Sequence, residues 1–201
     1  FTNCGVQHIQ CPQTFEIRLD QIAFATALRS IEHPQLKTGT LEEKCVPELH
    51  QLYMSLLGAV AYLSHTRMDV IVFIVALQRR NHDPEVQHVR KLNKLLRWVQ
   101  KVPKRLVYRR FPQHASHLRI MSDAAFKKET EKGHCLRGAL YLRAPGDKSA
   151  AYANWQKQIV VHVLDWVCKN QRHVTRSTFS AELFVWRRRC RSWPVVVADA
   201  P

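Results

Sequence analysis

Hydrophobic residues in the first half of the chain recur at spacings of three and four, which predicts helices. A short strand that runs into a helix reaching Ile31 is expected over residues 14–32, followed by a loop with proline and glycine over residues 33–47. The apolar stripe of residues 47–63 predicts a second helix, and residues 69–78 predict a third that is apolar almost throughout.

The clearest helical pattern begins after residue 82. Asp83 suits the N-cap and Pro84 the first helical position, and the pattern continues to Lys101. One face is predicted to be buried and carries six apolar side chains: Val86, Val89, Leu92, Leu95, Leu96 and Val99. The opposite face carries five basic ones: Arg90, Lys91, Lys94, Arg97 and Lys101.

The pattern of apolar and polar residues changes after Pro103. Alternating apolar and polar residues predict strands over 106–111, 118–126 and 135–143, and a β-branched run predicts another over 159–168. A helix is expected to begin near Ser177. The plan is a helical first half and a β-β-β-α second half. We therefore assign the fold as α/β locally and α+β overall.

Charge narrows the choice of partner. The chain has 31 Lys and Arg against 16 Asp and Glu, a formal net charge of +15. Residues 79–119 hold twelve of these basic residues and only two acidic ones, which is two thirds of the net charge. Such a field favours a polyanion, so nucleic acid is the expected partner.

Several classes of protein are excluded or disfavoured by the same sequence. The apolar runs 52–63 and 70–77 are each shorter than a membrane-spanning helix and are separated by polar residues, so no membrane partner is expected. The six cysteines form no Cys-x-x-Cys pair, which favours reduced thiols and an intracellular location, cytoplasmic or nuclear. The first residue is Phe1, and we expect a segment of a longer protein.

Two acidic residues form a candidate metal site. Asp123 lies near the end of an expected strand, and Glu182 lies in the first turn of the expected helix. Two carboxylates that converge on one point suit Mg²⁺, and a pair of such ions can activate water against a phosphodiester. The alternative is that Glu182 is an ordinary acid at a helix N-terminus, where the helix dipole favours negative charge, and that Asp123 simply ends a strand.

Seven blocks of the sequence, in this order and spacing, resemble the end of the Pol polyprotein of copia-type LTR retrotransposons. They are residues 53–63, 66–69, 82–96, 122–126, 138–142, 166–171 and 174–182. Residues 4–21 are also similar to the late polymerase segment of that family.

The resemblance implies three regions. Residues 1–46 would be a remnant of the late reverse transcriptase, 47–103 a helical connection segment and 104–201 a truncated ribonuclease H-like domain with a mixed sheet and a helix. In the family this domain cuts the RNA strand of an RNA–DNA hybrid. The polymerase catalytic motif would precede Phe1, so the upstream polymerase part of the same polyprotein is an expected partner.

The resemblance also implies roles for individual residues. Asp123 and Glu182 would be catalytic acids that hold two Mg²⁺ ions, and Asp199, after an apolar strand, is the candidate for the third acid. The expected nucleic-acid contacts are Arg90, Lys91, Lys94, Arg97, Lys101 and Arg176.

Two other interpretations stay open at this stage. One is a catalytically dead, basic relic that binds nucleic acid. The other is a helical interaction protein, which would require that the apolar helices over 47–63 and 69–78 lack a partner inside the chain.

Overall fold

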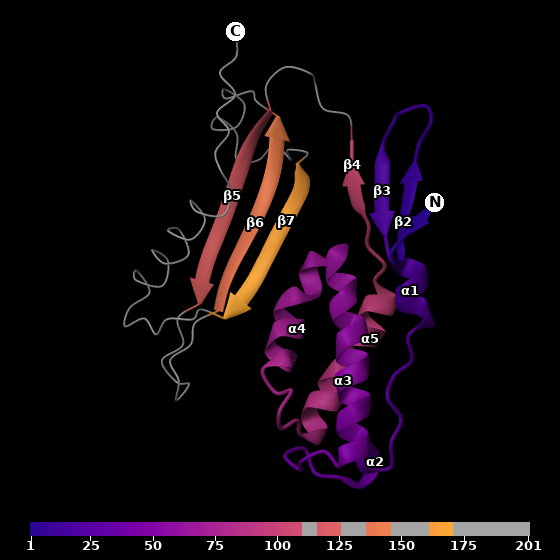
Figure 1. Cartoon of the computed structure of the whole chain (residues 1–201), viewed down its shortest axis with the longest axis vertical. Helices are drawn as coiled ribbons and strands as arrows, with labels where there is room; N and C mark the ends of the chain where they lie inside the picture. The colour runs from indigo at the N-terminus through magenta and orange to yellow at the C-terminus, as the bar shows by residue number, and fades with distance from the viewer. Residues whose placement is uncertain (110–115, 126–135, 146–160, 171–201) are drawn as a thin grey trace. The chain divides into compact units, whose positions relative to one another are not determined.

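The computed structural model describes residues 1–109, 116–125, 136–145 and 161–170. It divides the chain into two compact units, Phe1–Arg110 and Phe111–Pro201 (Figure 1). The first unit combines a four-stranded sheet with helices, and the described part of the second is a three-stranded sheet. Mixed helices and antiparallel sheets agree with the α+β expectation.

The sheet of the first unit joins the two ends of that unit. Its strands lie in the order β1 (Thr2–Asn3), β2 (Val6–Gln10), β3 (Ile17–Asp20) and β4 (Leu106–Tyr108), all antiparallel. Strand β4 follows every helix of the unit in sequence, yet it pairs with β3. The structure therefore divides the chain after Arg110, whereas the sequence suggested a change of region at residue 103.

Strands β1 and β2 were not anticipated from the sequence, and a two-residue turn creates them. Cys4 and Gly5 have φ angles of 46° and 69°, and they connect paired residues Asn3 and Val6. A two-residue hairpin of this kind needs the left-handed conformation at both central positions, which glycine adopts without strain.

The helices of the first unit enclose its hydrophobic core. They are α1 (Ile22–Ala27), α2 (Gln35–Thr38), α3 (Pro47–Tyr62), α4 (Ile71–Gln78) and α5 (Val86–Lys101), with short 3-10 turns η1 (Leu63–His65) and η2 (Met68–Val70). The helices expected over 47–63 and 69–78 are thus confirmed. None of the helices in the described residues is long and apolar enough to cross a membrane.

Helices α3, α4 and α5 pack on one another through the predicted stripes. All six apolar residues predicted for the buried face of α5 are at most 8% exposed. The Tyr53 hydroxyl of α3 donates a hydrogen bond to the Leu77 carbonyl oxygen of α4 at 2.8 Å. The two apolar helices therefore do have partners inside the chain, which removes the premise of the helical interaction protein.

The start of α5 differs from the prediction. The N-cap is Glu85 rather than Asp83, and His88 completes a capping box with it. Residues 84–86 instead run beside the segment that precedes α3, because the Cys45 amide donates to the Pro84 carbonyl oxygen at 3.0 Å. Asp83 forms an ion pair with Lys44 at 2.8 Å. Because of this tertiary pairing, the helix begins two residues later than predicted.

Helix α1 is shorter than expected. It ends at Ala27, and Leu28 is extended, with φ −68° and ψ 142°. Ile31, predicted on the same helix, is buried in the core, but its backbone amide donates to the Asn93 side-chain oxygen at 2.9 Å. A side chain of α5 therefore satisfies a backbone group that a longer α1 would have satisfied internally.

The described part of the second unit is an antiparallel meander in the order β5 (Ser116–Ala125), β6 (Leu136–Pro145) and β7 (His162–Asn170). The three strands expected over 118–126, 135–143 and 159–168 are therefore present. A register shift lies between Tyr141 and Leu142, opposite Leu164. The helix expected near Ser177 lies outside the described residues.

Candidate nucleic-acid interface

Helix α5 presents a row of basic side chains. Arg90, Lys94, Arg97 and Lys101 follow one another at spacings of three and four, so they lie along one side of the helix. Lys94, Arg97 and Lys101 are exposed, as is Lys91 beside the row. The helix contains no acidic residue. The charged residues on its outer surface are therefore all basic.

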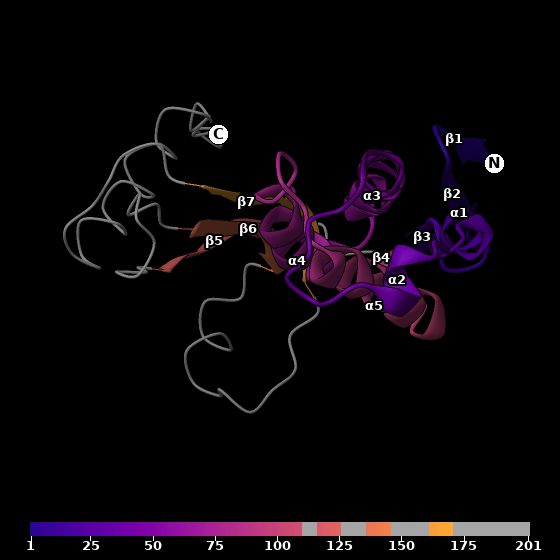
Figure 2. The ribbon, with the colours of Figure 1, turned by 90° about the horizontal axis from the view of Figure 1, so that it is seen from below.

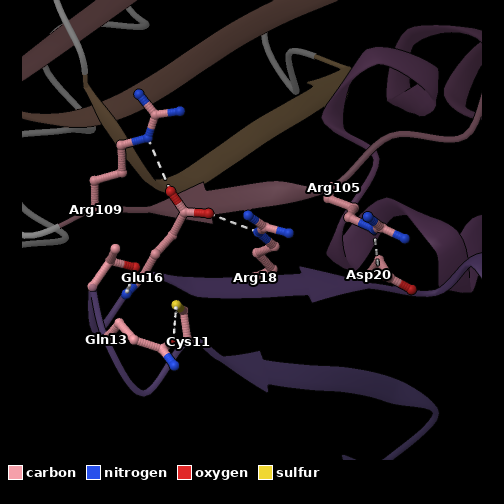
Figure 3. A network of polar contacts seen from close by, with 8 residues as sticks. Cys11, Gln13, Glu16, Arg18, Asp20, Arg105 and Arg109 are labelled. Atoms are coloured by element: carbon pink, nitrogen blue, oxygen red, sulfur yellow. Dashed lines mark hydrogen bonds and ion pairs between the residues drawn. The ribbon is translucent and has the colours of Figure 1, made fainter.

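Six basic residues of the neighbouring elements are ion-paired and share four carboxylates. Six ion pairs hold Arg18, Lys44, Arg67, Lys104, Arg105 and Arg109. In Figure 3 the Glu16 carboxylate lies between the guanidinium groups of Arg18 (2.6 Å) and Arg109 (3.0 Å). The hydrogen bond from Arg18, helped by that from Arg109, holds the pKa of Glu16 below its ordinary value. One carboxylate thus compensates part of the positive charge of these two guanidinium groups.

Helix α5 shows the opposite pattern. Within residues 1–109, no carboxylate pairs with Lys91, Lys94, Arg97 or Lys101. Lys91 donates only to the neutral Gln87 side chain, at 3.0 Å. Four of the predicted nucleic-acid contacts therefore lie on α5 with no carboxylate paired to them within residues 1–109.

Arg90, the fifth predicted contact on α5, is placed differently. It is half-buried, and its Nη2 donates to the backbone oxygens of Leu36 (2.7 Å) and Gly39 (3.4 Å). Helix α2 and the turn after it are thereby attached to α5, beside which α2 lies in Figure 2. Arg90 consequently has a structural contact that a purely solvated basic face would not require.

Trp98 is partly covered by cations rather than open to a base. The ring is 37% exposed, and the Arg67 guanidinium lies 5.2 Å from its centroid. The Lys104 ammonium lies 5.7 Å from the same centroid. These cation–π contacts make Trp98 a packing residue at the C-terminal end of α5.

Asp123 is the one predicted acid within the described residues. It is exposed on β5 and stands opposite Gly138 of β6, which in turn stands opposite Cys168 of β7. A Cβ atom added at Gly138 would meet no atom within 4 Å. The facing strand therefore places no side chain directly opposite Asp123.

Asp165 provides a contrast on the same sheet. It pairs with Tyr141, which pairs with Ile120, so these three side chains share one face. Residues three apart in a strand project to opposite faces, which places Asp165 on the face opposite Cys168 and Asp123. The backbone amide of Trp166 donates to its Oδ1 at 2.8 Å.

The remaining predicted site residues, Glu182, Asp199 and Arg176, lie outside the described residues. Among the residues that are described, no group of three or more His, Cys, Asp or Glu side chains is placed to hold a metal ion. The structure therefore locates one member of the predicted acidic site and does not test the assembly of the other two.

The sequence pattern missed two polar residues of α5 that organise the interface. Asn93 and Gln100 were not singled out, yet both bind backbone groups of the segment that precedes α2. They follow Arg90 by three and ten residues, which places them near the same side of the helix, and this spacing is the signal that could have identified them.

Comparison with known proteins adds no relative. A scan against family models, a search of curated proteins and a search of solved structures each give no significant match.

Proposed function

We propose that this chain binds the sugar–phosphate backbone of nucleic acid through α5, as a segment of a copia-type retrotransposon Pol protein whose partner is an RNA–DNA hybrid. The observation that carries the proposal is the charge distribution of the first unit. The six ion-paired cations lie on the sheet and the loops, whereas Lys91, Lys94, Arg97 and Lys101 of α5 are exposed and pair with no carboxylate within residues 1–109.

The geometry of the basic row suits a phosphate backbone. Side chains three or four residues apart on a helix lie about 5–6 Å from one another. From Lys94 to Lys101 the row therefore follows consecutive phosphates along one strand. Binding of this kind releases counterions, so the affinity falls steeply as salt rises.

The test is the salt dependence of binding to a labelled RNA–DNA hybrid, measured by fluorescence anisotropy. Lys94→Gln removes one phosphate contact and is expected to reduce the slope of log affinity against log salt by about 0.9. Lys44→Gln removes the same charge from an exposed ion pair with Asp83 and is the matched control. Equal slopes in the Lys94→Gln variant and the unmodified chain would refute backbone binding by α5.

A second function, ribonuclease H catalysis, is favoured by the position of Asp123. It is exposed on the first strand of an antiparallel meander. Its carboxylate oxygens are the hard donors that Mg²⁺ prefers, and Glu182 and Asp199 would complete the site. The bound ions would supply activation of water and stabilisation of the leaving oxygen. Asp123 itself would contribute its carboxylate to that site from β5.

Catalysis is tested by Mg²⁺-dependent cleavage of the labelled hybrid, with duplex DNA as the second substrate. Asp123→Asn is expected to abolish cleavage of the hybrid. Asp165→Asn changes the same residue type on the opposite face of the same sheet and is expected to leave cleavage intact. If the folded chain binds the hybrid without cutting it, the enzymatic function fails and the catalytically dead binding protein remains.

The cellular setting belongs to the same proposal. Within the described residues, Cys4, Cys11 and Cys45 are free thiols. This supports an intracellular site of action, in the cytoplasm or nucleus, where the upstream polymerase part of the polyprotein would also act.

A further inference from the structure

A hollow of about 690 Å³ lies between the segment around α2 and helix α5. This volume falls within the range of small-molecule sites. The residues that line it combine an apolar wall with several basic groups: Ile31, Glu32, His33, Pro34, Leu36, Lys37, Arg90, Asn93 and Arg97.

The walls of the hollow are fixed by side chains of α5. Asn93 is buried and exchanges two hydrogen bonds with the Ile31 backbone, each of 2.9 Å. Gln100 Nε2 donates to the carbonyl oxygens of Ala25 and Leu28, also at 2.9 Å. Together with the Arg90 contacts, these bonds hold the segment against the helix. The hollow is thus formed without a ligand.

Arg97 differs from the other polar residues on this side of α5, because it does not bind the backbone of the facing segment within the described residues. Residues 90, 93, 97 and 100 of α5 face residues 25–39. Arg90, Asn93 and Gln100 each form hydrogen bonds with backbone atoms of that segment. Arg97 lines the hollow and is exposed, and within residues 1–109 the structure gives it neither an ion pair nor a hydrogen bond. A guanidinium held at the edge of a preformed hollow is suited to bind phosphate oxygens.

Two further donors reach the same space. Lys37 is exposed at the end of α2 and lines the hollow. The Nδ1 atom of His33 accepts the Gln35 amide at 3.2 Å, so the neutral ring carries its proton on Nε2 and offers a donor there. Glu32 is the one acid in the lining. Ile31, Pro34 and Leu36 provide the apolar surface on which a base can lie.

We infer that this hollow binds a single unpaired nucleotide, with its phosphate on Arg97 and Lys37 and its base against the apolar wall. The inference deepens the proposed function and rests on it for its biological source, an unpaired end of the nucleic acid whose backbone lies on α5. Free nucleotides share the same chemistry, so the experiment separates the two sources.

The first measurement is calorimetric titration of the full chain with adenosine 5′-monophosphate, adenosine and inorganic phosphate. We expect the nucleotide to bind more tightly than either of its parts. Arg97→Gln should weaken it by about tenfold, as expected for the loss of one charge-assisted hydrogen bond. Lys44→Gln removes the same charge from an exposed ion pair outside the lining of the hollow and should leave the nucleotide affinity unchanged. Glu32→Gln should raise it.

The second measurement compares a blunt RNA–DNA hybrid with one that carries an unpaired overhang. The unmodified chain should prefer the overhang, and the Arg97→Gln chain should not. Equal nucleotide affinity in the Arg97→Gln and unmodified chains overturns the inference, as does binding of adenosine as tight as that of the nucleotide. A free-nucleotide site without preference for the overhang overturns the nucleic-acid source. If the blunt hybrid does not bind at all, the proposed function fails whatever the nucleotide does.

Discussion

The guanidinium of Arg67 and the carboxylate of Asp69 form a two-pronged ion pair, Nε to Oδ1 at 2.9 Å and Nη2 to Oδ2 at 3.1 Å. The Arg67 side chain is only 5% exposed. Its Nη1 donates to the carbonyl oxygens of Val99 and Val102 at the C-terminal end of α5. Residues 66–69 are one of the blocks on which the family resemblance rests. Through Arg67 they bind the C-terminal carbonyl oxygens of the helix that carries the basic row.

Asp69→Asn is expected to destabilise the first unit. The substitution leaves the buried Arg67 guanidinium without its counter-charge, which costs about 2–4 kcal/mol of unfolding free energy. Chemical denaturation followed by circular dichroism measures the loss. Asp83→Asn is the matched control, because its partner Lys44 is 73% exposed and the loss should stay within about 0.5 kcal/mol. Equal losses in the two variants would contradict a special role for the Arg67 pair.

The same pair makes stability depend on acid pH. Burial opposes ionisation of Asp69, but hydrogen bonds from Arg67 and Lys104 outweigh burial and hold its pKa below the ordinary value. The ionised form is therefore favoured by folding. Its contribution is complete above the pKa of an unfolded aspartate, about 4, and is lost as the pH falls through the lowered folded value. Unfolding free energies between pH 6 and about pH 3 should fall more steeply in the unmodified chain than in Asp69→Asn.

His88 should produce a second pH dependence, nearer neutrality. Burial, followed in strength by charge effects that partly oppose one another, holds its pKa below the ordinary value. In the capping box its Nδ1 accepts the Glu85 amide at 3.0 Å, which requires an unprotonated nitrogen. The unfolded chain therefore binds this proton more tightly, and stability decreases as the pH falls below about 6.5.

The His88 prediction is checked with His88→Gln, since glutamine can cap the same amide without titrating. Thermal unfolding of both chains from pH 7.5 to about pH 5 is the measurement. The other histidines are common to both chains, so the difference between the two profiles belongs to His88. Parallel profiles would contradict the prediction.

Helix α5 illustrates how far the sequence predicts the fold. Its six apolar positions and four of its five basic positions were assigned correctly, because a 3.6-residue period depends on local spacing alone. Its first residue was not, because Asp83 and Pro84 are committed to the segment around Lys44 and Cys45. That partner is about forty residues away, and no local rule for caps contains it.

The candidate site shows the same division. Spacing predicted that Lys94 and Arg97 lie on the outer surface of one helix, and it could not predict that Arg90 binds the Leu36 backbone or that a hollow lies beside Arg97. Strand alternation placed Asp123 on β5, but only the pairing register shows that Asp165 lies on the other face. Contacts between distant segments decide what each polar residue is available to bind.

Gln21 and Thr66 form a buried hydrogen-bonded pair. Replacing Gln21 should cost less unfolding free energy than replacing Thr66. Thr66 Oγ1 donates to Gln21 Oε1 at 3.1 Å, and both residues are at most 4% exposed. Gln21 Nε2 is buried and has no hydrogen-bond partner within the described residues. Replacing Gln21 leaves the Thr66 hydroxyl without its acceptor but also removes the unsatisfied Nε2 donor, whereas replacing Thr66 leaves Gln21 Oε1 as a second unsatisfied atom beside Nε2.

A double-mutant cycle measures this inequality. Thr66→Val is expected to cost about 1–3 kcal/mol of unfolding free energy, Gln21→Met less, and the double variant less than the sum of the two by at least about 0.5 kcal/mol. Methionine keeps the length of the glutamine side chain and valine the shape of threonine, so packing changes stay small. Additive losses would show that the hydrogen bond between Thr66 and Gln21 contributes nothing. A larger loss for Gln21→Met than for Thr66→Val would show that Nε2 has a partner in solution.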